Sequence, residues 1–301
     1  MIKKYVFFTS MVIYFSFSIV FTAFSDQPIV PVIFIHKGDS YYLRDSLWQA
    51  KQHNSRVILI GDVDKKYEGI EYHDMSPYLK EASYFKIIYQ HIAENNYNYE
   101  LFCFQRWFVL KEFMRVHNIS RCFYADSDVM LYCNVTQEEK HFFQHDVVLL
   151  ISSAGVYSGG ISFWSLSVLE DFCFFLISYY ENKENLTKWI KWFNGPRVKG
   201  TGVCDMTIFT EYARARKNLV IPNIRGVVEG ATFDHHINTD EGGIYKMVEV
   251  SGKRKIKEIK WDGCFPYGYN FSLKQLIRFK TLHFQGGSKD LMKNFRKSKD
   301  V

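Results

Sequence analysis

The sequence predicts an α/β fold in which an open mixed sheet is flanked by helices. Apolar runs at residues 29–35 and 56–60 predict two buried strands, and the amphipathic stretch 40–53 between them predicts a helix. This strand–helix–strand order is typical of nucleotide-binding α/β folds, whose ligands bind beyond the carboxyl ends of the strands. A hydrophobic content of 47% is ample for the core of such a domain.

The same alternation continues along the chain. Buried strands are expected at residues 121–125, 146–151, 161–164 and 279–284, and helices at 77–94, 102–117, 166–180 and 203–216. Residues 245–250 and 255–261 predict a β-hairpin. Residues 188–193 predict a surface helix or a lip over a site, and residues 225–236 and 238–243 look irregular. Because no repeat or low-complexity linker interrupts the pattern, residues 26–301 are predicted to form a single domain.

Residues 1–25 are predicted to be a signal peptide or a membrane anchor. Lys3 and Lys4 precede residues 5–24, which carry no charge. Ala23-Phe24-Ser25 resembles a cleavage site, but the apolar stretch exceeds the roughly 7–15 residues of a usual signal core. An uncleaved segment would be a single-pass anchor with the remainder lumenal or extracytoplasmic, and a cleaved one would release a secreted protein. Four N-glycosylation sequons, which fit either route, begin at Asn118, Asn134, Asn185 and Asn270.

Charge and cysteine usage exclude several functions. The net charge of +6 is mild and is concentrated at the chain ends and in residues 253–260. Nucleic-acid binding would require a stronger basic face, whereas this excess is sufficient to attract anionic nucleotides or lipid head groups. The six cysteines include no CxxC pair, so buried free thiols are expected rather than zinc or thioredoxin-like sites.

Asp126 and Asp128 form the strongest candidate site. The apolar run that starts at Arg121 ends abruptly in these two carboxylates, which are separated by Ser127. Two ionised acids that close together repel each other unless a cation lies between them. Oxygen ligands of this kind suit Mg²⁺ or Mn²⁺, and such sites let a substrate phosphate complete the coordination shell. The pattern therefore predicts a divalent cation held against a diphosphate.

Two further candidates follow the first two predicted strands, and a third lies on a helix. His36 and Asp62 could contact a base or ribose, although a solvated histidine and a turn-capping aspartate explain the pattern nearly as well. Arg106 could bind a phosphate bidentately or could pair with an acid such as Glu112.

The last candidates are two glycines and an aspartate. Gly159 and Gly160 precede a predicted strand and could admit a ligand close to the backbone or simply form a turn. Asp205 opens a predicted helix, where an acid is also favoured by the helix dipole alone.

The combination of Asp126-Ser127-Asp128 after a strand with the later motif His283-x-x-Gly286-x-x-Lys289 resembles nucleotide-sugar glycosyltransferases of the GT-A fold, particularly the glycogenin-like group. The resemblance extends over most of the chain after residue 28. It implies that the two aspartates and the histidine ligate Mn²⁺ (or Mg²⁺), that Lys289 holds the donor diphosphate, and that Gly286 permits close approach of the backbone to phosphate. The sequence departs from the group after Lys289, where Asp290-Leu291 replaces the usual Pro-Trp.

The resemblance also suggests weaker assignments. Arg106 resembles a donor-binding arginine, the segment of Gly159 and Gly160 resembles a strand that faces donor sugar and acceptor, and Asp205 occupies the place of an acid that faces the acceptor. For an inverting enzyme, Asp205 would be the general base that deprotonates the acceptor. The resemblance implies a UDP-sugar as the nucleotide-sugar donor, and a carbohydrate, protein or lipid as the acceptor.

Two other functions remain open from the sequence. Asp126-Ser127-Asp128-Val129 also resembles the nucleophile motif of haloacid-dehalogenase-type phosphatases, although no later Asp-Asp pair follows and about a hundred residues precede the motif. The third possibility is an inactive, membrane-tethered carbohydrate-binding relative that retained the fold.

Overall fold

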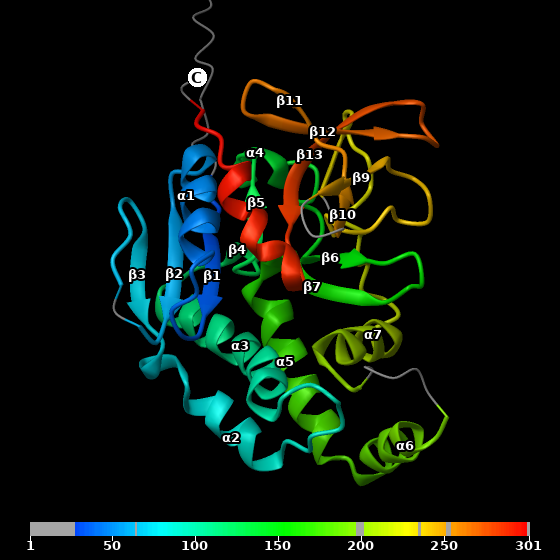
Figure 1. The fold of residues 1–301 in the computed structure, drawn as a ribbon. Helices are drawn as coiled ribbons and strands as arrows, with labels where there is room; N and C mark the ends of the chain where they lie inside the picture. The colour runs from blue at the N-terminus through cyan, green and yellow to red at the C-terminus, as the bar shows by residue number, and fades with distance from the viewer. Residues whose placement is uncertain (1–27, 64, 197–201, 234–235, 251–253, 300–301) are drawn as a thin grey trace, which may run out of the picture.

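The computed structural model describes residues 28–63, 65–196, 202–233, 236–250 and 254–299. Its main sheet has six strands in the order β3-β2-β1-β4-β7-β6 (Figure 1). Strands β3, β2, β1 and β4 are parallel, whereas β7 is antiparallel to both β4 and β6. The bounds of these strands are β1 Val32–His36, β2 Val57–Gly61, β3 Glu71–Asp74, β4 Arg121–Ala125, β6 Val147–Ile151 and β7 Tyr157–Ser165.

Helices cover both faces of this sheet (Figure 1). Alternate residues of β1 point to opposite faces, so Ile33 packs with helices α2, α3, α5 and α7, whereas Phe34 packs with α1. The bounds of the helices are α1 Leu43–His53, α2 Lys80–Ile88, α3 Tyr97–Val116, α4 Val135–Glu139, α5 Leu166–Glu181, α6 Lys183–Asn194 and α7 Asp205–Ala215, with a 3₁₀ turn η1 at Ser76–Tyr78.

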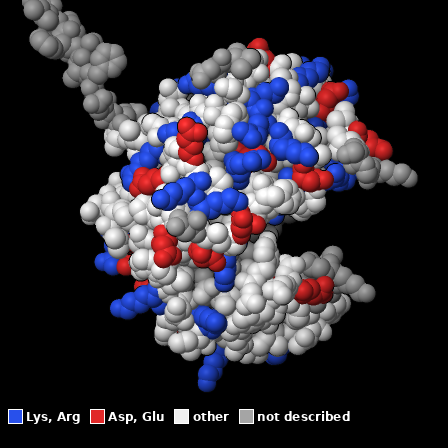
Figure 2. All heavy atoms as spheres, turned by 60° about the vertical axis from the view of Figure 1, so that its left-hand side comes forward, with Lys and Arg blue, Asp and Glu red and all other residues white. Residues whose placement is uncertain are grey.

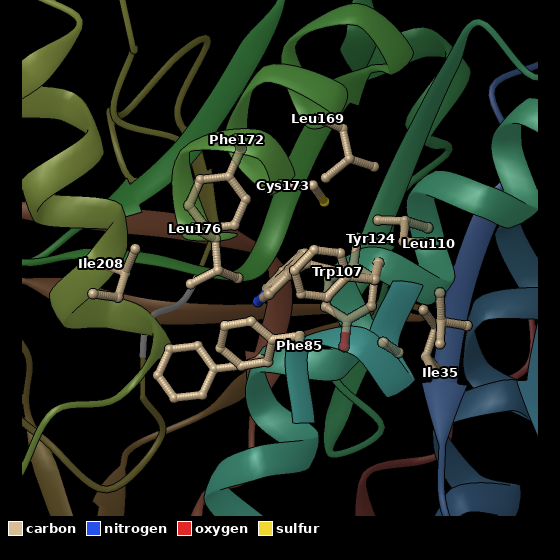
Figure 3. Packing of buried hydrophobic residues seen from close by; sticks show 14 of the residues in the cluster. Ile35, Phe85, Trp107, Leu110, Tyr124, Leu169, Phe172, Cys173, Leu176 and Ile208 are labelled. Carbon is tan, nitrogen blue, oxygen red and sulfur yellow. The ribbon is translucent and has the colours of Figure 1, made fainter. Parts of the chain in front are cut away.

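The larger core cluster is centred on Trp107 of α3. Its fully buried indole lies against Tyr124 of β4 and against Phe172 and Phe209 of the neighbouring helices α5 and α7. Figure 3 shows these aromatic and aliphatic side chains converging between the sheet and the helices. Tyr124 is the penultimate residue of β4, and Trp107 packs against it. This aromatic core therefore supports the residues that follow the strand.

A second, five-stranded sheet carries the C-terminal part of the chain. Its order is β11-β12-β13-β5, and β8 pairs in parallel with β13. Strands β9 and β10 form a separate antiparallel pair, and a 3₁₀ segment, η2, follows β13. The bounds are β5 Val129–Leu131, β8 Ala231–Phe233, β9 Met247–Val250, β10 Arg254–Lys257, β11 Lys260–Asp262, β12 Phe265–Asn270, β13 Gln275–His283 and η2 Gly286–Phe295.

The predicted α/β fold with an open mixed sheet is confirmed, and so is the hairpin, since Val250 pairs with Arg254. Other boundaries were wrong. The helix predicted at 102–117 begins at Tyr97, because the Asn96 side chain accepts hydrogen bonds from two backbone N–H groups of the first turn. The helix predicted at 77–94 ends at Ile88, and residues 188–193 belong to the longer helix α6.

Four short elements were not predicted at all: β3, β5, α4 and β12. Strand β12 contains Pro266 and Gly268, residue types that weaken a strand prediction. Gly268 is required there because a Cβ atom would lie 2.5 Å from the ring of Phe279. Strand β8 lies within the region 225–236 that was expected to be irregular.

The predicted N-terminal segment, residues 1–25, lies outside the described residues. Within the described part of the chain, no helix combines the length and apolar character needed to cross a bilayer. All six cysteines are free thiols, and four of them are buried, as the scattered spacing predicted.

Candidate metal and nucleotide site

The chain changes sheets at the DxD element. Strand β4 ends at Ala125, and the N–H of Asp126 then donates to the carbonyl of Gly160 at 2.8 Å. A tight turn follows, closed by the N–H of Val129 on the carbonyl of Asp126 at 3.0 Å. Strand β5 leaves the main sheet and pairs with β13 in a register that sets Val129 opposite His283. This crossing between sheets brings Asp128 into contact with His283, which lies 155 positions later in the sequence.

Asp126, Asp128 and His283 form a group that could hold a cation. Each contributes one ligand atom, and these atoms all lie within 4.8 Å of one another. Ligands at about 2.1 Å from one ion lie within roughly 4.2 Å of each other, so small side-chain movements would close the site. Two carboxylates and an imidazole fit Mn²⁺ better than Mg²⁺, which prefers oxygen ligands alone. The donor set therefore fits the predicted metal.

Asp128 is held ionised by two basic side chains. His283 Nε2 lies 3.1 Å from its Oδ1, and Lys289 Nζ lies 3.2 Å from its Oδ2. Burial alone would raise the pKa of Asp128, but His283 and Lys289 together lower it below its ordinary value. Burial would likewise lower the pKa of Lys289, yet Asp128 and Tyr42 raise it. Both groups therefore stay charged at neutral pH.

Asp126 belongs to a second charged cluster. Arg106 donates to its Oδ1 at 2.5 Å, and the hydroxyl of Tyr124 donates to the same oxygen at 3.0 Å. Burial raises the pKa of Asp126, Arg106 acts against this, and the adjacent Asp128 adds to the rise. A divalent cation between the two carboxylates would remove the repulsion.

Arg106 joins Asp126 to Asp205. Its second guanidinium nitrogen donates to Asp205 Oδ2 at 2.7 Å, and the indole N–H of Trp107 donates to the same oxygen at 3.1 Å. Asp205, the first residue of α7, is 5% exposed and lies behind Arg106. The alternative that Arg106 pairs with an acid is therefore confirmed, but its partners are Asp126 and Asp205. Glu112, the acid named as an example, pairs with Arg115 instead.

His36 lies beside the DxD turn. Its two ring nitrogens form hydrogen bonds with the hydroxyls of Ser127, at 2.9 Å, and Ser40, at 3.0 Å. The hydroxyl of Ser46 on α1 donates to the carbonyl of Ser127 at 2.6 Å. Burial lowers the pKa of His36, which keeps the ring neutral. Side chains from β1 and α1 therefore fix the residue between the two aspartates.

The glycines serve different purposes. A Cβ on Gly160 would lie 2.6 Å from a carboxylate oxygen of Asp126, and one on Gly159 would lie 2.5 Å from the ring of Trp107. The missing Cβ at each position therefore makes room for a side chain of the protein, Asp126 at Gly160 and Trp107 at Gly159. Gly286 has φ +57°, which lets the backbone turn between His283 and Lys289.

The charged groups open onto a pocket of about 550 Å³. Its walls come from β1 and the following loop, from α3, from the DxD turn and from η2, namely Ile35, His36, Lys37, Ser40, Tyr42, Asn98, Tyr99, Phe102, Cys103, Arg106, Asp126, Ser127, Asp128 and Lys289. A smaller hollow of about 280 Å³ adjoins it and shares Lys37, Asn98 and Phe102. Asp62 lines this second hollow and accepts a hydrogen bond from the N–H of Gly38 at 2.6 Å.

Several residues at the site were missed from the sequence. The ammonium of Lys289 lies 4.9 Å from the centre of the Tyr42 ring, and Tyr99 and Phe102 line the pocket from the start of α3. The one available signal was the aromatic content of 18%, which does not single out any ring. In the segment Asp234-His235-His236, the first two residues lie outside the described part, and the ring of His236 stacks on that of His283 at 6.0 Å.

No protein-family model and no curated protein sequence matches this chain. Among solved structures, apo mouse xyloside xylosyltransferase 1 is 7% identical with a TM-score of 0.45, over 63% of this chain and 83% of that chain. The bifunctional glycosyltransferase WbbM is 11% identical with a TM-score of 0.46, over 88% of this chain and 48% of that chain. The glycosyltransferase GlyE of Streptococcus pneumoniae is 13% identical with a TM-score of 0.37, over 71% and 48%.

This chain spans about half the length of WbbM and of GlyE. The pocket gives no support to the phosphatase alternative, because its acids among the described residues are Asp126 and Asp128 alone, and both carboxylates already contact cationic side chains.

Proposed function

We propose that this chain is a metal-dependent glycosyltransferase of the GT-A type, which moves a sugar from a nucleoside-diphosphate donor to a glycan, protein or lipid acceptor. One observation supports this most directly: Asp126, Asp128 and His283, from distant parts of the sequence, gather as a cation-binding group at the edge of a pocket that Lys289 also lines. UDP-sugars are the first donors to test, because the sequence resembles the glycogenin-like group.

The chemistry follows from charge. A nucleoside diphosphate is a poor leaving group until its negative charge is neutralised, and a divalent cation held by Asp126, Asp128 and His283 would supply that Lewis-acid stabilisation. Lys289 adds a positive charge at the pocket edge, where Asp128 holds its ammonium at 3.2 Å. The Gln285 side-chain amide lies 3.3 Å from His283 Nδ1, which orients the other ring nitrogen toward Asp128.

Arg106 and Asp205 have different parts in this proposal. Arg106 lines the pocket and fixes the carboxylate of Asp126. Asp205 contacts Arg106 and Trp107 and does not line the pocket. We therefore propose that Asp205 orients Arg106 and does not act as the general base. The neutral His36 and the hydroxyl of Ser46 hold the backbone and side chain of Ser127, and thereby fix the spacing of the two aspartates.

Ligand-dependent thermal stability tests the proposal. A ligand present at 100 times its Kd stabilises the folded state by about 2.7 kcal/mol, so the cognate nucleotide sugar with Mn²⁺ is expected to raise Tm clearly. Asp128→Asn should abolish this donor-dependent shift, whereas Asp262→Asn, the same change on the exposed strand β11, should leave it intact.

Two outcomes would contradict the proposal: no nucleotide stabilises the wild type with Mn²⁺, or Asp128→Asn responds like the wild type. Mn²⁺-dependent hydrolysis of the stabilising donor then separates an active transferase from an inactive carbohydrate-binding relative. Hydrolysis of p-nitrophenyl phosphate without any response to nucleotide sugars would favour the phosphatase alternative.

A further inference from the structure

The outer face of the β11–β12–β13 sheet exposes a group of aromatic and aliphatic side chains. Tyr269 pairs with Leu276 and Tyr267 with Arg278 across β12 and β13, so alternate residues share this face. The turn beyond it exposes Phe271 by 50% and Leu273 by 48%, and Leu276 is 45% exposed. We call this surface the aromatic face. It comprises the side chains of Phe265, Tyr267, Tyr269, Phe271, Leu273 and Leu276. Clustered exposed apolar groups mark interaction surfaces.

The turn that presents Phe271 and Leu273 is built to do so. The side chain of Asn270 is buried and accepts a hydrogen bond from the N–H of Leu273 at 2.9 Å. The N–H of Phe271 donates to the carbonyl of Ile244 at 2.8 Å, and Lys274 takes the unusual φ of +53°. Because the side chain of Asn270 is buried, this sequon is a poor glycan acceptor in the folded chain.

Cationic side chains border the aromatic face. Lys260 pairs with Tyr267 from β11, Lys274 lies at the turn, and Arg278 lies over the ring of Phe265 at 5.2 Å. Asp262 is the acid on the same strands. Figure 2, which brings the α1 side of the molecule forward, shows Lys and Arg side chains mixed with Asp and Glu over the upper part of the molecule. Aromatic rings mixed with lysine and arginine are typical of surfaces that lie at a bilayer interface.

The described chain also begins at this end of the molecule. Val32, the first residue of β1, pairs with Val57, the first residue of β2. Because β2 follows soon after α1 ends at His53, the start of β1 lies near His53. The ring of His53 lies 5.8 Å from that of Phe265 in the aromatic face. The residues that precede position 28 include 5–24, which are uncharged and have the length that a helical membrane span requires.

We propose that the aromatic face docks on a phospholipid bilayer that contains anionic lipids. Phe271, Leu273 and Leu276 enter the interfacial region, and Lys260 and Lys274 contact the lipid phosphates. The cation-binding group lies at the opposite, carboxyl end of β4 and therefore faces away from that bilayer (Figure 1). This interaction is independent of the reaction proposed above.

Hydrogen exchange of the full chain in vesicles tests the docking. Phosphatidylcholine vesicles with phosphatidylglycerol, compared with phosphatidylcholine alone, should slow exchange in residues 265–278 by about tenfold, and high salt should reverse the effect. Helix α6 is the internal control, because Ile190 and Trp192 are each 40% exposed beside lysines but lie at the other end of the molecule. Phe271→Ser combined with Leu273→Ser should lose the protection, and Ile190→Ser combined with Trp192→Ser should keep it.

Three results would overturn the proposal: no added protection with phosphatidylglycerol, protection of α6 instead, or protection that depends on protein concentration without lipid, which would indicate a second copy of the chain. If the first 25 residues are removed during maturation, co-sedimentation of the mature protein with phosphatidylglycerol vesicles replaces the exchange measurement. Sedimentation that the Phe271/Leu273 double variant loses supports the docking, and a mature protein that stays in solution contradicts it.

Discussion

The Asp126 side and the Lys289 side of the candidate site are held by different means. Arg106 lies in a buried setting between Asp126 and Asp205, above the fully buried Trp107. Lys289, in contrast, belongs to a 3₁₀ segment that is tethered by an exposed ion pair from the neighbouring strand β10. Arg106 is thus fixed by burial, whereas Lys289 is a more exposed side chain on a segment that the buried Leu291 and Met292 hold to the core.

Removal of the charge on each side should show the largest difference. Arg106→Met would leave Asp126 and Asp205 as buried, uncompensated acids, which is expected to cost about 3–5 kcal/mol in the free energy of unfolding. Lys289→Met should cost less than about 1 kcal/mol, because Lys289 is more exposed and Asp128 keeps His283 as a partner. Urea denaturation of both variants measures the difference.

Arg106→Lys provides the control for that comparison. It keeps the charge but loses the fork that reaches both carboxylates, so its loss should lie between those of the wild type and Arg106→Met. Equal losses for the two methionine variants would show that burial does not distinguish the two halves.

The sequence could predict the candidate metal ligands and Lys289, but it could not predict the pairing of Arg106 with Asp205. The apolar strand before Asp126 and the spacing of His283 and Lys289 are local patterns, and the residues that they single out lie together in the structure. The pairing of Arg106 with Asp205 joins residues 99 positions apart, and helical pattern alone cannot reveal which acid an arginine will meet. The chain's passage from the main sheet into β5 was equally hidden, because three residues are too few for a periodic signal.

Alanine at one glycine on each side probes backbone packing. Gly159→Ala places a Cβ 2.5 Å from the Trp107 ring and 2.9 Å from that of Phe209, both fully buried, so a loss of about 1–3 kcal/mol is expected. Gly286→Ala meets no atom within 4 Å and should cost only about 1 kcal/mol, from its positive φ. Thermal unfolding of the two variants measures which one loses more stability. A larger loss for Gly286→Ala would mean that the backbone is more tightly packed on the Lys289 side than on the Asp126 side.

His53, the last residue of α1, lies outside the candidate site, with its ring 5.8 Å from that of Phe265 in β12. Burial, and then the nearby Lys299 and Arg278, lower its pKa to about 4 from about 6.5. A depressed histidine pKa means that protonation favours the unfolded chain. The related stability is therefore complete above about pH 6.5 and is lost as the pH falls toward 4, by about 1–2 kcal/mol at pH 5. Urea denaturation at pH 7.5 and 5 should show this loss in the wild type, and His53→Phe should reduce it. An unchanged pH dependence in the variant would show that other groups cause the loss.

The smallest effect on stability is expected at the tether of the Lys289 side. Arg254 donates to both carboxylate oxygens of Asp290, at 2.6 and 3.0 Å, and to the carbonyl of Gly287. Arg254→Met should change the free energy of unfolding by less than about 1 kcal/mol, because the pair is exposed.

If the pair positions Lys289, however, donor KM should rise severalfold while kcat changes little, since a diphosphate contact would form equally in the ground and transition states. Asp290→Asn should share this phenotype, and Arg214→Met, which removes another exposed ion pair on α7, should not. A fall in kcat without a change in KM would instead mean that the tether serves the reacting geometry, and the Lys289 side would then be as closely fixed as the Asp126 side.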